Sequence, residues 1–444
     1  MNKKALNGLR RASVVFFWVT FVAISVLFFS NDFGIVDIHK TSIIVAVGVD
    51  TVDEEVQVTA QLAVPKPSQS GDNVEYTEVQ GRGETVADAL NEINAKTGFY
   101  PQLQFCKLIL LGDNCKDKNI FRVLGCFYRK NYSELTAYVA MCNGKASEML
   151  AMPTVTSDMT TTVIQRALSD ELEKCANVSS VNMKDIALAH NSRSAACYMP
   201  LIEANVQGTS EEGDNIGGDD IKSGDDSGGG SSSSSNGSSG SGGGEGGNEG
   251  GSGSSSNGGG GSSQGGSSGS SGGEQKPVEF TARRTVIFNN GMFAGILDEQ
   301  QAFALNLLKN EIRLAVLPCD TEQYHYALGL GNANGGFDVK IVDGIPEVTL
   351  NFKAYAQITG IKKPVDLKET AKDDTLSPDV KEAANKAVVG RLTSLMEICR
   401  QTDCDFLGIK ENIFKMHYGY FEEMPSDVLQ KMRIDYKVDI KSRN

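Results

Sequence analysis

The sequence lacks the residue spacings on which common enzyme sites depend. It contains four histidines, and none stands in a metal-ligand spacing such as H-x-x-x-H or H-E-x-x-H. These are His39, His190, His325 and His417. Outside a glycine- and serine-rich tract there is no G-x-S-x-G motif and no phosphate-binding loop. We therefore predict a non-enzyme with no catalytic, cofactor-binding or metal-ligating residues, and the sequence identifies no ligand-binding residue.

Two kinds of polar cluster outside these motifs are typical of surface. The carboxylates in Asp373-Asp374 and in Glu422-Glu423 are adjacent, so on regular structure the two side chains of each pair diverge. Tyr324-His325-Tyr326 places one histidine between two aromatic residues, a pattern more typical of a strand edge than of a site. Neither kind of cluster changes the prediction that the chain is not an enzyme.

An excess of positive charge is also missing. The formal net charge is −14, and residues 206–276 hold ten acidic residues against Lys222 and Lys276. Much of the acidity therefore belongs to one solvated stretch and does not indicate a specific cationic partner. It does argue against nucleic-acid binding, which needs a basic surface to neutralise phosphates.

The nine cysteines include no C-x-x-C pair. They are Cys106, Cys115, Cys126, Cys142, Cys175, Cys197, Cys319, Cys399 and Cys404. Because their number is odd, at least one thiol has no partner within the chain. Several lie in apolar, strand-like surroundings, which favours small buried hydrophobic residues. Disulfides are not implied.

Only one apolar run is long enough to cross a bilayer. It extends from Ala12 to Phe29, contains no charge, and follows Lys3, Lys4 and two arginines. Eighteen helical residues reach roughly 27 Å, close to the hydrocarbon thickness of a membrane. No small-x-small cleavage site follows, which favours a retained anchor over a cleaved signal peptide. The positive-inside rule then places the rest of the chain outside the cytoplasm as a single-pass membrane protein.

Residues 206–276 form the second organising feature. From Gly224 to Gly273 the chain is almost entirely glycine and serine, with too little apolar surface to offset the entropy cost of ordering. We predict that this tract is disordered. As a linker it would separate its ends by roughly 45 Å, but a long loop within one domain costs little more. Composition alone leaves both uses open.

Local signals predict strands and helices before the tract. Apolar alternation predicts a hairpin over 43–49 and 56–64. Thr85 and Asp88 form a capping box that starts a helix, and Gly98 ends it. Residues 105–111 are nearly all apolar, which predicts a central strand. Further helices are expected near 118–129, 147–152 and 162–174.

After the tract, Asn290-Gly291 joins two apolar runs, 283–288 and 293–297, which predicts a tight hairpin. Asp298 and Gln301 then cap a helix whose core face carries Ala302, Leu305, Leu308 and Ile312. The remaining expected elements are strands at 337–342 and 348–359, a long helix from Ser377-Pro378, and a final strand at 432–440.

This alternation predicts an α+β fold: one transmembrane helix, then extracytoplasmic α+β domains with mixed sheets and a disordered insertion. The expected divisions are a basic segment with anchor at 1–33, an N-terminal region at 34–205, the tract at 206–276 and a C-terminal domain at 277–444.

Three blocks after the tract occur in a characteristic order. They are RTVIFNNGMFAGILDE at 284–299, the long helix, and TDCDFLGI at 402–409. This order resembles the Ger(x)C family, the C subunits of bacterial spore germinant receptors. Four segments before the tract also resemble segments that occur in this order in the family. They are VGVD at 47–50, GETVADAL at 83–90, CKLILLG at 106–112 and MPLI at 199–202.

The sequence departs from the family in three places. Cys404 and Ile409 replace small residues of the turn, and no cysteine precedes Cys106, so the usual lipid-attachment motif is missing. A transmembrane helix in its place would keep the body on the same side of the membrane. The tract interrupts a direct connection in the family, which favours an inserted loop with Val206 and Pro277 close in space.

The resemblance implies a subunit of a nutrient-sensing complex in spores, located on the outer face of the inner spore membrane. It implies docking onto multi-spanning membrane partners, which bind the small molecules, and no chemistry of its own. The alternative is a membrane-anchored sporulation or cell-envelope scaffold of the same fold that belongs to no nutrient receptor.

Overall fold

The computed structural model describes residues 14–26, 41–66, 73–129, 134–155, 159–169, 178–206, 277–309, 312, 314–362 and 376–442. Residues 14–26 are helical. The predicted basic segment, the last residues of the predicted anchor and nearly all of the predicted disordered tract lie outside the described residues. Within the described ranges, no helix combines the length and the apolar character that crossing a bilayer requires.

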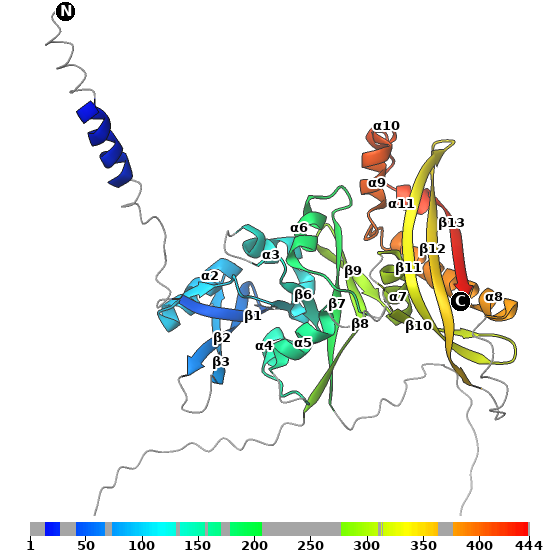
Figure 1. Cartoon of the computed structure of the whole chain (residues 1–444), viewed down its shortest axis with the longest axis horizontal. Coiled ribbons are helices and arrows are strands. Elements are labelled where there is room, and N and C mark those ends of the chain that lie inside the picture. The colour runs from blue at the N-terminus through cyan, green and yellow to red at the C-terminus, as the bar shows by residue number, and fades with distance from the viewer. Residues whose placement is uncertain are drawn as a thin grey trace, which may run out of the picture. The chain divides into compact units, whose positions relative to one another are not determined.

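The body contains two β-sheets with helices packed against them (Figure 1). In the described residues the first sheet has nine strands in the order β3-β2-β1-β5-β6-β7-β8-β9, with β4 beside β1. These strands are β1 (Thr41–Val52), β2 (Glu55–Lys66), β3 (Asn73–Gly83), β4 (Tyr100–Gln102), β5 (Leu108–Leu111), β6 (Tyr138–Cys142), β7 (Ala196–Val206), β8 (Val278–Asn289) and β9 (Met292–Leu297). Parallel and antiparallel pairs both occur, as the mixed-sheet prediction requires.

The centre of the first sheet follows the sequence signals closely. β1 and β2 form the predicted hairpin, with Val52 opposite Glu55. β5 lies between β1 and β6, and all four of its side chains are buried. It starts three residues later than predicted because the N–H of Cys106 donates to the carbonyl of Leu103, which makes the preceding residues a turn.

Helix α2 (Val86–Thr97) has the capping box and the left-handed Gly98 that the sequence predicts. It packs on the edge strand β3, which was not predicted. Two glycines of β3 allow this close approach: a Cβ on Gly81 would lie 2.1 Å from the carbonyl oxygen of Ala89, and one on Gly83 would lie 2.5 Å from the Cβ of Asp88.

The other helices around the first sheet are short. They are the 3₁₀ helix η2 (Asp113–Asp117), α3 (Ile120–Arg129), α4 (Ala146–Leu150), α5 (Thr160–Leu168) and α6 (Met183–Asn191). Helices α3, α4 and α5 correspond to the three predicted ones, although residues 170–174 of the third lie outside the described residues. Helix α6 was not predicted.

The two ends of the glycine- and serine-rich tract meet at the β7–β8 ladder. Val206 lies opposite Val278 in an antiparallel pair, next to Pro277. This is the proximity expected of a loop inserted within a domain, and it places strands from both sides of the tract in one sheet (Figure 1).

Because the strands on either side are already paired, the tract is expected to be dispensable for folding. Replacing residues 207–277 by Asn-Gly, which suits a two-residue hairpin, should raise the unfolding free energy by about 3 kcal/mol through a smaller loop-closure entropy. Urea unfolding of the shortened and full chains measures this difference. If the shortened chain fails to fold, the prediction is wrong and the tract is a spacer that folding requires.

The second sheet follows a tight hairpin and a capped helix. Asn290 and Gly291 both have positive φ, 51° and 78°, as the predicted two-residue turn between β8 and β9 requires. Asp298 and Gln301 form the predicted capping box of α7 (Glu299–Leu308). Every side chain from Gln301 to Leu308 is buried, so the prediction of a single core face was too narrow. Helix α7 packs against β8 on one side and against the second sheet on the other.

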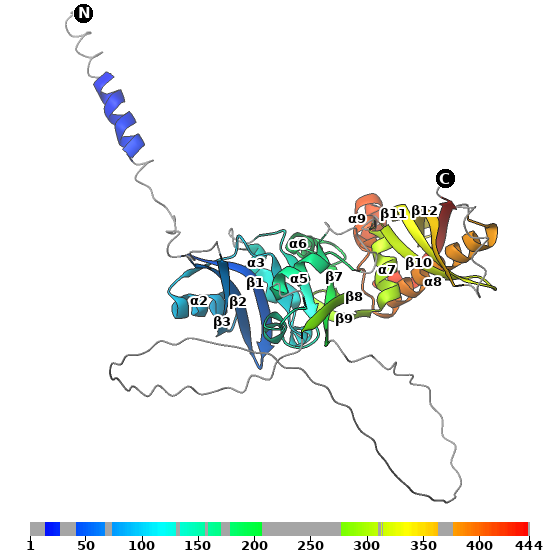
Figure 2. The ribbon, with the colours of Figure 1, turned by 60° about the horizontal axis from the view of Figure 1, so that its bottom comes forward.

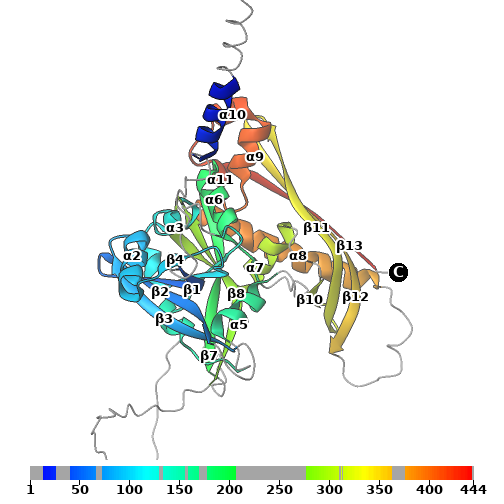
Figure 3. The same ribbon diagram turned by 60° about the vertical axis from the view of Figure 1, so that its left-hand side comes forward.

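The second sheet has the order β10-β11-β12-β13, from β10 (Leu314–Asp320), β11 (His325–Val342), β12 (Ile345–Lys362) and β13 (Arg433–Ser442). β11 begins twelve residues earlier than predicted, because its first half is rich in glycine and asparagine and carries little strand signal. The predicted long helix is α8 (Pro378–Gln401), capped by Ser377, and it packs on this sheet (Figure 2). The chain then forms α9 (Ile409–Met416), α10 (Tyr418–Glu422) and α11 (Val428–Lys431) before the predicted strand β13 (Figure 3).

Candidate functional site

The turn between α8 and α9 is organised around one buried carboxylate. Asp405 is 1% exposed. Its side chain accepts hydrogen bonds from the backbone N–H groups of Gly408, Ile409 and Lys410, at 3.1, 2.7 and 2.6 Å. The hydroxyl of Ser194, just before β7, donates to the same carboxylate at 2.5 Å. One side chain therefore joins the start of α9 to the first sheet.

The sequence explains why Asp405 takes this role. Gly408 stands at the N-cap of α9 with φ 87° and offers no side-chain cap, so the first N–H groups of the helix need another acceptor. A carboxylate placed there also complements the positive end of the helix dipole. Burial raises the pKa of Asp405 above its ordinary value, and the hydrogen bonds that oppose this effect do not cancel it.

This shift predicts a pH dependence with a definite sign. Because the pKa of Asp405 is higher in the folded chain than the ordinary value of about 3.9, folding favours the protonated form. Its contribution to the unfolding free energy is therefore full below about pH 3.9 and declines as pH rises through the raised pKa. We expect the stability difference between the wild type and Asp405→Asn to fall as pH rises above 4. Urea unfolding at several pH values measures it, and a difference that grows with pH would contradict the prediction.

A second contact lies one helical turn further along. Glu411 on α9 accepts a hydrogen bond from the backbone N–H of Arg193 at 2.8 Å and forms an ion pair with Lys415 at 3.2 Å. The backbone hydrogen bond from Arg193 is the main cause that lowers the pKa of Glu411. The guanidinium of Arg193 lies over the ring of Phe414, 4.7 Å from its centroid. The segment between α6 and β7 is thus held against α9 by polar and aromatic contacts together.

A third group of contacts joins the turn to β8 and α7. The side-chain N–H of Asn289 donates to the carbonyl of Asp403 at 3.0 Å. The thiol of Cys404 contacts the carbonyl of Phe288 at 3.4 Å. At the end of α7, the ammonium of Lys309 donates to the carbonyl of Leu407 at 3.2 Å. The turn is therefore fixed from three sides.

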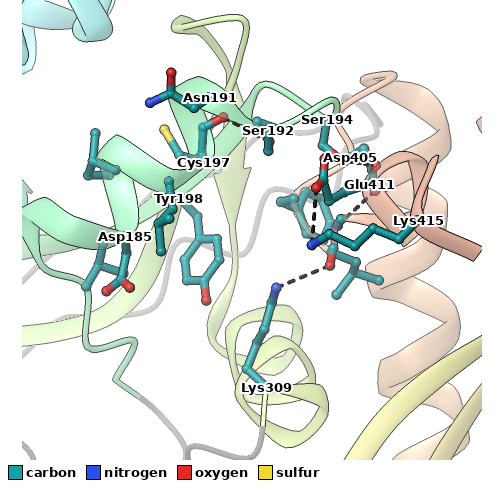
Figure 4. Close-up of a pocket in the computed structure, with 18 residues that line it drawn as sticks. Asp185, Asn191, Ser192, Ser194, Cys197, Tyr198, Lys309, Asp405, Glu411 and Lys415 are labelled. Atoms are coloured by element: carbon teal, nitrogen blue, oxygen red, sulfur yellow. Dashed lines mark hydrogen bonds and ion pairs between the residues drawn. The ribbon is translucent and has the colours of Figure 1, made fainter. Parts of the chain in front are cut away.

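Beside these contacts lies an open cavity of about 600 Å³ (Figure 4). α6 and β7 supply an apolar wall that includes Leu188 and Tyr198, and the ammonium of Lys309 lies 5.9 Å from the centroid of the Tyr198 ring. The opposite wall comes from the turn and α9. The charged residues that line the cavity have both signs. They are Asp185, Asp405 and Glu411, which are acidic, and Lys309 and Lys415, which are basic.

The cavity offers little reactive chemistry. Burial raises the pKa of Cys197, which lines it, and raises that of the adjacent Cys404 to about 12, so both thiols stay protonated at neutral pH. Of the other cysteines, those at 106, 115, 142, 319 and 399 are buried, as small hydrophobic residues would be, and Cys126 is partly buried. None of the described cysteines is disulfide-bonded, and Cys175 lies outside the described residues. Among the described residues, no cluster of three or more histidine, cysteine or carboxylate groups could hold a metal ion.

The histidines are separated in the structure. His190 stacks on Phe121 at 4.7 Å and contacts the hydroxyl of Tyr128, within a second cavity of about 770 Å³ that Arg122 and Arg129 also line. His325 starts β11 and pairs with Asp320 at 2.6 Å. His417 contacts the carbonyl of Val339, and His39 lies outside the described residues. Of the acid pairs, Glu422 and Glu423 are exposed and the pair at 373–374 lies outside the described residues.

A second buried carboxylate explains why two of the family-like segments before the tract, VGVD and CKLILLG, have the residues they do. Asp50, at the end of VGVD, is fully buried and accepts from the backbone N–H groups of Ala146 and Ser147 at 2.8 and 3.0 Å. Gly112, which ends CKLILLG, must be small, because a Cβ there would lie 2.0 Å from the Asp50 carboxylate. The two segments thus maintain the fold at this position.

Ser194, Lys309 and the role of Asp405 were missed by sequence reasoning. The turn that contains Asp405 was noted for its order in the chain, and an aspartate three residues before a glycine that starts a helix is the signal that could have identified it. Ser194 lies 211 residues away, and no local pattern indicates its contact with Asp405.

Comparison with known proteins gives a consistent result on both sides of the tract. Residues 34–204 match the family model "Spore germination protein N-terminal domain", and residues 283–444 match "Spore germination B3/ GerAC like, C-terminal". No match was found among curated proteins. The crystal structure of the GerBC protein is similar over 90% of this chain and 97% of its own, with 11% identity and a TM-score of 0.47. With the two family models in order over most of its length, the chain belongs to the Ger(x)C family, the C subunits of spore germinant receptors.

Proposed function

We propose that this chain acts as a non-catalytic, membrane-anchored subunit that docks onto multi-spanning subunits of a germinant receptor and takes part in nutrient-triggered germination. The observation that carries the proposal is the ordered match of both family models.

The anchor in this proposal is the uncharged run from Ala12 to Phe29, whose described part, residues 14–26, is helical. The four basic residues before it would stay in the cytoplasm, so the body would lie on the outer face of the inner spore membrane. Resistance of the full chain to alkaline carbonate extraction, lost on removal of residues 1–33, is the expected result.

The proposed divisions are the anchor segment at 1–33, the N-terminal region at 34–205, the disordered tract at 206–276 and the C-terminal domain at 277–444. They are divisions of the sequence and not of the sheets, because β8 and β9 complete the first sheet. The contacts of Asp405 and Glu411 with the segment before β7 then join the two regions, so a partner that binds one region can act on the other.

An affinity pull-down of the tagged, detergent-solubilised chain from sporulating cells tests docking. We expect mass spectrometry to identify two multi-spanning membrane proteins. A chain lacking residues 1–33 is the control, because partners that it still retains bind the body and not the anchor. Recovery of cell-wall proteins alone, or of no partner, would overturn receptor docking and favour an envelope scaffold.

A further inference from the structure

Three large apolar side chains are exposed beside the start of β1. Ile43 is 39% exposed, Phe99 44% and Phe105 52%. We call these three residues the entry patch, because the chain enters the first sheet here. Burial of these side chains against another apolar phase would be favourable.

The pairing of the backbone brings these residues together. The segment from Phe99 to Lys107 runs beside the start of β1: Thr41 pairs with Tyr100, and Ile43 pairs with Gln102. The N–H of Lys107 then donates to the carbonyl of Val45 at 2.8 Å. Further along, buried clusters cover both faces of β1. At its start, Ile44 is fully buried and Ile43, which points to the opposite face, is exposed.

Charge contributes little to this surface. Lys107 follows Phe105 and is exposed, and it interacts with Glu134 nearby. Lys96, near Phe99, forms an ion pair with Glu92 at 3.0 Å and donates to the carbonyl of Gln80. The entry patch itself contains no charge, so a partner would contact it mainly through apolar burial.

The length of the chain before β1 indicates what covers the patch. The apolar run ends at Phe29 and β1 begins at Thr41. Twelve residues span at most about 40 Å when fully extended, and about 20 Å on a root-mean-square basis when flexible. If the run is a membrane anchor, the start of β1 is the part of the first sheet that the bilayer can reach most readily.

We propose that the entry patch lies in the lipid headgroup region, as a second membrane contact that sets the orientation of the body. This inference rests on the proposed anchor. Phenylalanine and isoleucine side chains bury apolar surface at the boundary between headgroups and acyl chains. The contact would fix which face of the body is free to meet a multi-spanning partner.

Tryptophan fluorescence tests this contact in the full chain, because Trp18 is the only tryptophan. Trp18→Phe removes it, and Phe105→Trp or Phe99→Trp then places a single probe in the entry patch. Val316→Trp is the matched control: Val316 is 59% exposed on β10 of the second sheet. Each variant is reconstituted in vesicles of phosphatidylethanolamine and phosphatidylglycerol, with and without a lipid brominated near its headgroup.

We expect blue-shifted emission from positions 99 and 105 and a loss of that emission with the brominated lipid, with little change in high salt. Position 316 should emit as in water and should not be quenched. Water-like, unquenched emission from both patch positions would overturn the proposal. The wild-type chain distinguishes this failure from that of the anchor: if Trp18 escapes quenching by deeply brominated lipid, the anchor itself is wrong.

Discussion

Replacing Asp405 by alanine is expected to lower the free energy of unfolding by about 4 kcal/mol. The change removes the acceptor for three backbone N–H groups at the start of α9 and for the hydroxyl of Ser194. Each buried donor left without an acceptor costs about 1–3 kcal/mol, and partial entry of water reduces the sum. For a body of this size the melting temperature should fall by about 6 °C. Thermal unfolding followed by circular dichroism measures the change.

The control is Asp439→Ala, because Asp439 is a half-exposed carboxylate that pairs with Lys441 at 3.5 Å on β13. Removal of a surface ion pair costs at most about 1 kcal/mol. Ser194→Ala, alone and combined with Asp405→Ala, completes a double-mutant cycle that isolates the contact between the first sheet and the turn. Equal losses for Asp405→Ala and Asp439→Ala would show that the buried carboxylate does not hold the turn.

The contacts of the turn between α8 and α9 also predict which part of the Asp405→Ala variant should loosen first. Asp405 and Glu411 join the turn and α9 to the segment before β7, and Lys309 joins the turn to the end of α7. Losing one of these contacts leaves the other two. The two sheets should therefore keep their own cores while the turn loosens. Limited proteolysis should cut the variant near residues 402–408 before either sheet unfolds.

The local signals in the sequence predicted much of the fold. Capping boxes at Thr85 and Asp298, the Asn290-Gly291 turn and the start of the long helix at Ser377 were all confirmed. Each depends on contacts between residues two to four positions apart, so the information lies within one short segment.

The elements that were missed are those whose structure depends on distant neighbours. β3 is an edge strand with glycines placed for α2, and the first half of β11 is rich in glycine and asparagine. Neither carries a strong strand signal of its own, because strand preference depends on the neighbours across the sheet. Helix α7 is buried on all sides because sheets lie on both sides of it, which a single helical face cannot indicate.

The candidate site was less predictable than the fold, for the same reason. The turn at 402–409 stood out by its order in the chain, but its function as a connector depends on Ser194, Asn289 and Lys309, which come from three other elements. The cavity exists only after α6, β7, the turn and α9 have come together. Sequence reasoning found the turn and could not find its partners.

The close packing of α7 gives the last prediction: Gly335→Ala should lower the free energy of unfolding by about 4 kcal/mol. A Cβ on Gly335 of β11 would lie 1.8 Å from the carbonyl oxygen of Leu307 and 2.8 Å from its carbonyl carbon. These are backbone atoms of a helix whose side chains from Gln301 to Leu308 are all buried, so no rotamer change relieves the clash. The helix or the strand must move, and such overpacking costs about 1–3 kcal/mol even where the clash is with side chains.

The adjacent residue supplies a closely matched control. Gly336→Ala adds the same methyl group on the same strand, but its Cβ would meet no atom within 4 Å. Neither glycine has a positive φ, so alanine introduces no backbone strain at either position. Gly336→Ala should leave stability unchanged or raise it by a few tenths of a kcal/mol, about the gain from a less flexible unfolded chain. Similar unfolding midpoints in urea for the two variants would show that α7 can move away from β11, and that the helix joining the two sheets is less tightly held than its burial indicates.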